Sequence, residues 1–292
     1  MKNNEIIIIE KNETKLKKLS KEVIALVQSR MCNNRYFRSK VLDTEFKFKL
    51  INDAPTNGLM RVNLELNSKK DTLKGFEISY DINPNDPVEW IRLIMAHELY
   101  HLFYAVNSVV KLDGYCPSDG SYSFTTIQRA IKVGGETKIY GKQFEENLCW
   151  VLAYDTCKGV NAGKKRGVNM DIYDKHVYFI ENYSAPIRAI IEAFTVIHCD
   201  LTSIEFDRSA NYVPYNKFYY CMSCGDISYI VNSYDSVLGC NAWYNLMNYV
   251  DEYYLSQNET AKEKIYASLD AYKNNKGKRS QKVVSNQATV SA

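Results

Sequence analysis

Two histidines and a glutamate stand at a spacing that suits metal chemistry, in the run His97-Glu98-Leu99-Tyr100-His101. Residues four apart on a helix lie on the same face, so His97 and His101 can direct their imidazole nitrogens at one cation. Zinc binds neutral imidazole with bonds of about 2.0–2.1 Å. The carboxylate of Glu98 can take a proton from a metal-activated water and pass it to a leaving amine. The motif therefore predicts a zinc site with His97 and His101 as ligands and Glu98 as general base.

The alternative interpretation is a pair of packed histidines with a buried glutamate between them. The chain contains four histidines, and two of them belong to this motif. A buried carboxylate is unfavourable unless a partner compensates its charge. The metal-binding interpretation is therefore favoured.

The motif is predicted to lie on a central helix. Asp86-Pro87-Val88-Glu89 supplies an N-cap carboxylate, a proline at the first helical position and a glutamate two positions later. Apolar residues then recur at helical spacing to about Val109, on most sides of the helix. A helix that is apolar on most sides is typical of a buried position.

The segment Arg92–His101, with the helix and strands predicted before it, resembles the zincin metallopeptidases over roughly residues 1–160. The resemblance implies an α+β fold in which a small mixed sheet packs on the central HExxH helix. It also implies that His97 and His101 are metal ligands and that Glu98 is the base. No glycine or third histidine follows His101 at the positions that the metzincin branch uses. The gluzincin branch, which takes a glutamate from a later helix, is the better match.

Glu146 is the predicted third ligand, and Glu145 and Glu192 are the alternatives. A catalytic zinc usually has three protein ligands and keeps its fourth position for water. Adjacent residues on a helix point about 100° apart, so only one of Glu145 and Glu146 can face the metal. Glu146-Asn147-Leu148 resembles the Glu-Gly-Leu run that carries the third ligand in some bacterial gluzincin-like proteins, with Asn147 in place of the glycine.

Periodicity predicts the remaining elements before the motif. A buried strand is expected at Glu5–Glu10 and a helix at Asn12–Met31. Strands are expected at Val41–Ile51, Leu59–Leu66 and Gly75–Ile82, with a turn at Asp53–Gly58 and a polar loop at Asn67–Lys74. Zincins bind substrate by strand addition at a sheet edge, so the resemblance makes Gly75–Ile82 the candidate edge strand near the active-site cleft. The alternative is an interior strand that does not contact substrate.

The chain after the motif is predicted to be mainly helical. A loop and a hairpin are expected within Lys111–Lys142, and two short strands within Phe218–Val231. The expected helices are Phe144–Thr156, Ser184–Asp200, Gly239–Leu255 and Glu259–Tyr272. The predicted domains are a catalytic domain at 1–160, a mainly helical subdomain at 161–272 and a disordered basic tail at 273–292.

Cys221-Met222-Ser223-Cys224 resembles one half of a zinc ribbon. A complete site needs two further ligands. His198, Cys199 and Cys240 are available, but the chain has no second CxxC pair. A turn with two unligated thiols is the favoured interpretation.

Composition narrows the class of partner. The formal net charge is +3, which gives no support for a nucleic-acid or membrane partner. No apolar run approaches the ~20 residues that a membrane span needs, and no signal peptide is evident, so a cytoplasmic protein with reduced thiols is expected. The predicted function is a zinc metallopeptidase acting on peptides or proteins. The alternative is a catalytically silent zincin fold used for binding or structure, for example in a phage particle or a repressor system.

Overall fold

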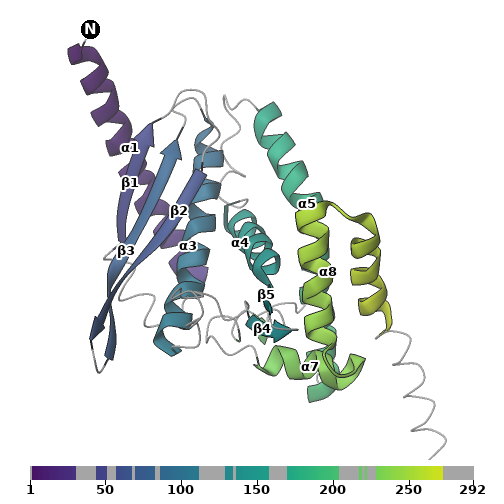
Figure 1. The fold of residues 1–292 in the computed structure, drawn as a ribbon. Coiled ribbons are helices and arrows are strands. Elements are labelled where there is room, and N and C mark those ends of the chain that lie inside the picture. Colours follow the sequence, from purple (N-terminus) through teal and green to yellow (C-terminus); the bar gives the residue numbers. More distant parts are fainter. Residues whose placement is uncertain are drawn as a thin grey trace, which may run out of the picture. The chain divides into compact units, whose positions relative to one another are not determined.

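The chain has a mixed α+β fold in which helices take up most of the described residues (Figure 1). The structure is a computed structural model, and it describes residues 2–30, 44–50, 57–67, 70–82, 86–111, 129–133, 136–157, 170–203, 217–218, 221 and 228–271. The chain divides into two compact units. The first comprises Met1–Thr126, Glu145–Ser184 and Ser223–Gly225, and the second comprises Ile127–Phe144, Ala185–Met222 and Asp226–Ala292. Within these described ranges, no helix combines the length and apolar character that crossing a membrane would demand.

The first helix is longer than the sequence predicts. α1 runs from Lys2 to Arg30, so the strand predicted at Glu5–Glu10 is wrong and the helix predicted from Asn12 is confirmed. No glycine or proline interrupts the chain from Lys2 to Arg30. Once the helix has formed after Asn12, it can therefore extend toward the N-terminus through Ile6–Ile9, because adding a residue to an existing helix costs little free energy. α1 packs against the motif helix, and the hydroxyl of Ser20 contacts the sulfur of Met95 there at 3.7 Å. The buried residues of α1 are Leu16, Leu19, Ser20, Val23 and Val27.

Three strands form a mixed sheet in the order β1-β3-β2. β1 (Thr44–Leu50) pairs with β3 (Lys70–Ile82) in parallel, and β2 (Asn57–Asn67) pairs with β3 antiparallel, with an irregularity between Asn63 and Leu64. The sheet lies beside α1 and the motif helix (Figure 1). All three predicted strands are therefore confirmed.

The sheet corrects three details of the prediction. β3 begins at Lys70, so most of the polar loop expected at Asn67–Lys74 is strand, and Asn57 and Gly58 of the expected turn belong to β2. From Phe76 onward β3 lies between β1 and β2 and is paired with both, so the expectation that Gly75–Ile82 is an edge strand is wrong. This part of the central strand has no unpaired backbone edge to offer a substrate.

The motif helix α3 (Val88–Lys111) forms the core of the first unit, as predicted. Its backbone bonding begins with the amide of Ile91 donating to the carbonyl of Pro87 at 3.1 Å. The hydroxyl of Tyr80, on β3, donates to the carbonyl of Met95 at 3.4 Å. The next helix, α4 (Lys142–Cys157), is joined to α3 by a 2.6 Å hydrogen bond between the hydroxyls of Tyr100 and Thr156. These contacts fix the face of α3 that carries the histidines relative to α4.

The second unit is mainly helical, with one hairpin. β4 (Arg129–Val133) and β5 (Glu136–Tyr140) form the hairpin predicted within Lys111–Lys142. α5 (Met170–Thr202) begins well before the predicted Ser184, and its residues from Ala185 onward belong to this unit. α7 (Ser228–Leu238), α8 (Ala242–Ser256) and a helix at 259–271 complete it.

The strands predicted within Phe218–Val231 are wrong wherever this segment is described. Phe218 and Cys221 are helical, and α7 already begins at Ser228. Ile230, Tyr234 and Val237 are buried at helical spacing, and the hydroxyl of Tyr234 donates to the carbonyl of Ile190 at 2.5 Å. The domain boundary predicted at residue 160 and the tail predicted at 273–292 lie outside the described residues, so both stay predictions.

Candidate metal centre

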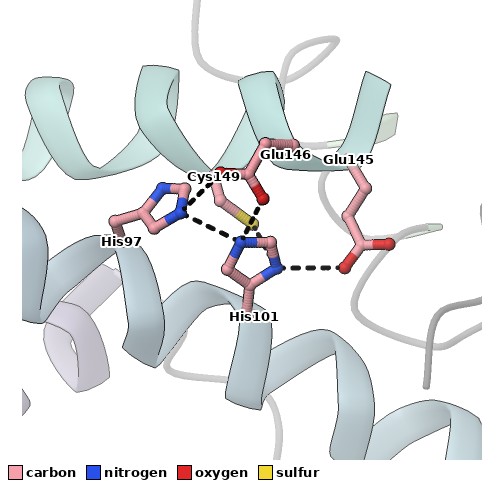
Figure 2. A network of polar contacts seen from close by, with 5 residues as sticks. All are labelled: His97, His101, Glu145, Glu146 and Cys149. Atoms are coloured by element: carbon pink, nitrogen blue, oxygen red, sulfur yellow. Dashed lines mark hydrogen bonds and ion pairs between the residues drawn. The ribbon is translucent and has the colours of Figure 1, made fainter. Parts of the chain in front are cut away.

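The three predicted ligands converge between α3 and α4 (Figure 2). The Nε2 atoms of His97 and His101 lie 3.0 Å apart. One carboxylate oxygen of Glu146 lies 3.1 Å from His97 Nε2, and the other lies 3.0 Å from His101 Nε2. Among the described residues, Glu192 does not belong to this group. The structure therefore brings together His97, His101 and Glu146.

The donor atoms fit a zinc ion in spacing and in chemistry. A tetrahedral zinc with bonds of about 2.0–2.1 Å holds its nitrogen and oxygen ligands about 3.3 Å apart, close to the triangle observed here. The two imidazole nitrogens face one another, and a neutral ring has only one N–H to donate. If both nitrogens carry lone pairs, the two lone pairs repel one another, and a cation bound between them would remove this repulsion. The Glu146 side chain is 45% exposed, so the group opens toward solvent on the side of this carboxylate.

Glu145 fixes the orientation of His101. Its Oε1 lies 3.2 Å from His101 Nδ1, on the edge of the ring opposite Glu146 (Figure 2). A proton on Nδ1 donated to this buried carboxylate leaves the lone pair of Nε2 directed at the ligand triangle. The sequence offered Glu145 only as an alternative ligand. The adjacent acidic pair was the available signal, because a ligating histidine commonly donates its second N–H to a carboxylate.

His97 is held by an aromatic stack. The indole of Trp150 lies over the imidazole of His97, with ring centroids 4.0 Å apart and planes 26° apart. Trp90 also stacks on Trp150, with ring centroids 5.9 Å apart and planes 10° apart. The buried Nδ1 of His97 has no hydrogen-bond partner among the described residues. Stacking on Trp150 therefore orients the ring of His97, as the carboxylate of Glu145 orients the ring of His101. The sequence analysis did not identify Trp150.

Glu98 follows His97 in the chain, is buried, and does not belong to the cluster of His97, His101 and Glu146. Burial raises the pKa of Glu98 to about 7, the charge of His101 opposes this rise and the charge of Glu146 adds to it. Burial and the charge of Glu98 also raise the pKa of Tyr80. A carboxylate with a pKa near neutrality can both accept and release a proton.

The two histidines differ in their proton affinity. Burial, with the charge of His101, lowers the pKa of His97 to about 4 despite its contact with Glu146. Burial also acts to lower the pKa of His101, but the contacts with Cys149, Glu145 and Glu146 outweigh it and the pKa is raised. His97 is thus already in the neutral form that a metal requires.

A zinc site around Cys221, the less favoured interpretation of the Cys221–Cys224 pair, is not assembled in the described part of the chain. Cys199 and Cys221 are buried, Cys240 is exposed, and none of them belongs to a metal-ligating group there. His198 instead contacts the hydroxyl of Tyr229 through Nδ1, at 2.7 Å. Cys224 lies outside the described residues.

Comparison of the chain with protein-family models, with curated proteins and with solved structures gives no match.

Proposed function

We propose that this chain is a zinc-dependent metallopeptidase of the zincin type, with His97, His101 and Glu146 as the metal ligands and Glu98 as the general base. The observation that carries the proposal is the cluster of His97, His101 and Glu146, in which the two Nε2 atoms lie 3.0 Å apart and each lies 3.0–3.1 Å from one of the two carboxylate oxygens of Glu146. Its ligand types, two histidines and a carboxylate, are a known set for catalytic zinc. The parallel and antiparallel strands that pack on the motif helix in the same unit support a zincin-like arrangement.

The residues of the site have two roles, metal binding and proton transfer. A bound zinc would supply a Lewis acid and would lower the pKa of a water in its fourth position. His97 and His101 are held by Trp150 and Glu145, so their lone pairs are oriented before any ligand binds. Glu98 takes a proton from the attacking water and delivers it to the leaving amine. A nearby cation lowers the pKa of Glu98 below its value of about 7, which keeps this base ionised at neutral pH.

The test combines metal content with peptide cleavage. The full chain is purified, supplied with zinc, dialysed and incubated with a proteome-derived peptide library that is read by mass spectrometry. We expect one zinc per chain at the triangle and cleavage at internal peptide bonds. Glu98→Gln should keep the zinc and lose at least about 10²-fold in cleavage rate, because only the base has been removed. Cleavage that survives undiminished in Glu98→Gln would contradict the mechanism, and zinc binding without any cleavage would favour a binding role for the fold.

A further inference from the structure

The ring of His101 faces a second group of donor atoms on its other edge. Nδ1 lies 3.2 Å from Glu145 Oε1 and 3.6 Å from the sulfur of Cys149 (Figure 2). Glu145 and Cys149 are four residues apart on α4, so their side chains leave the helix on the same face. The three donor atoms all lie within 4.8 Å of one another.

These distances suit a cation that binds sulfur. Zinc–sulfur bonds are about 2.3 Å long, so a tetrahedral ion holds a sulfur and a nitrogen about 3.6 Å apart and a nitrogen and an oxygen about 3.3 Å apart. The observed separations from Nδ1 are 3.6 Å and 3.2 Å. A thiolate and a carboxylate together balance the charge of a divalent ion. Both Glu145 and Cys149 are buried, so their rotamers are already restricted by packing.

The two donor groups share one histidine, and this links them. A neutral imidazole carries one N–H and one lone pair. When Nε2 is the ligand, the proton is on Nδ1, and when Nδ1 is the ligand, the proton moves to Nε2. In the second case the triangle keeps only His97 and Glu146, which is too few ligands for a tightly held catalytic zinc.

We propose that His101 Nδ1, Glu145 and Cys149 form a second metal site for thiophilic divalent cations, such as cadmium or zinc in excess, and that it competes with the first site for His101. Binding there replaces the thiol proton of Cys149, which goes to solvent, and shifts the His101 proton from Nδ1 to Nε2. The regulatory consequence rests on the proposed function, since a cation at the second site would switch off the peptidase. The metal site itself does not depend on any catalytic activity.

Cadmium tests the site directly. The metal-free full chain is titrated with cadmium while the ultraviolet charge-transfer band of cadmium–thiolate bonds is recorded. In Cys149→Ser the intensity of this band should fall by the contribution of one cadmium–thiolate bond. Cys157→Ser, which removes another buried cysteine of α4, should keep the share that depends on Cys149. Glu145→Gln keeps the thiol and should weaken that part of the titration by about tenfold, as removal of one ligand charge predicts. A titration identical in wild type and Cys149→Ser would overturn the proposal.

Competition is measured on zinc-loaded protein. Zinc released to a fluorescent indicator is followed as cadmium is added, and release should track the Cys149-dependent band. Cys149→Ser should need at least about tenfold more cadmium for the same release. Zinc that stays bound while the band grows would show that the two sites are independent and that the shared-histidine argument is wrong. Neither readout uses peptide cleavage, so failure of the proposed peptidase activity would be recognised separately.

Discussion

Trp150 stacks on His97 with ring centroids 4.0 Å apart, and the imidazole nitrogen away from the ligand triangle has no hydrogen-bond partner in the described part of the chain. The two histidines of the proposed metal site are therefore oriented in different ways. His101 is positioned by a charge, through Glu145, and His97 by an aromatic face. This difference makes the contribution of each support separable by substitution.

We expect Trp150→Ala to weaken zinc binding by about tenfold or more, because supports around a ligating histidine commonly contribute 10- to 100-fold in affinity. Trp150→Phe should stay closer to wild type, since it keeps a ring over His97. Affinity is measured by competition with a chromogenic chelator on the folded fraction. Equal affinities in wild type and Trp150→Ala would show that stacking does not position His97.

Glu146 and Glu145 should differ in their effect on metal affinity. Glu146→Ala removes a ligand of the triangle and should abolish stoichiometric zinc after dialysis. Glu145→Ala removes only the group that orients His101 and should cost about 10- to 100-fold. Glu145→Gln keeps an acceptor oxygen and should fall between Glu145→Ala and wild type. If the order of the two alanine variants were reversed, Glu145 would be the ligand, and unchanged zinc in both would direct attention to Glu192.

Asp251 should contribute to stability by capping α4. Its two carboxylate oxygens accept from the backbone amides of Gly141 at 3.2 Å and Gln143 at 3.0 Å. Gly141 stands just before the helix with a φ of 84° and has no side chain to cap it. We expect Asp251→Ala to lower the free energy of unfolding by about 1–2 kcal/mol, as loss of a helix cap does. Asp251→Asn, which keeps one acceptor oxygen, is the control in urea unfolding and should lose less.

His198 should make stability depend on pH. Burial, with the charge of Lys217, lowers the pKa of His198, so the folded chain binds a proton there less readily than the unfolded chain does. As pH falls through about 6.5, where an unfolded histidine titrates, the unfolded state takes up the proton first and the free energy of unfolding decreases. Tyr229, which contacts His198, has a raised pKa and does not titrate in this range. In His198→Phe the decrease between about pH 7.5 and pH 5.5 should be smaller than in wild type. Parallel pH curves for the two proteins would contradict this expectation.

The sequence predicted the motif helix and the pairing of His97 with His101 on one face of it, because both depend on local spacing. The capped start at Val88 and the four-residue step from His97 to His101 are properties of a single helix. The prediction of Glu146 over Glu145 needed the rotation of α4 about its axis. The resemblance of Glu146-Asn147-Leu148 to a gluzincin run suggested that Glu146 faces the histidines, and the structure has this rotation. The contact of Glu145 with the opposite edge of His101 could be seen only once both helices were placed.

The errors in the fold come from places where local preference and tertiary context disagree. The four isoleucines at Ile6–Ile9 favour a strand on propensity, yet α1 runs through them without a break. Strand order cannot be read from alternation, since an edge strand and a central strand can carry the same pattern. The resemblance to zincins suggested an edge strand at Phe76–Tyr80, whereas β1 pairs with this segment on one side and β2 on the other.

The position of β3 between β1 and β2 also constrains the order in which the sheet can assemble. Thr44 pairs with Phe76, which lies beyond the whole of β2 in the chain. On a ribosome, β1 and β2 emerge first, and neither has its native partner until β3 has followed. The antiparallel pair β2–β3 closes through a short connection and can form once Ile82 has emerged from the ribosome, so we expect β1 to dock last. While β1 waits, its exposed residues Glu45 and Lys47 place charges along the unpaired strand, which discourages pairing with another nascent chain.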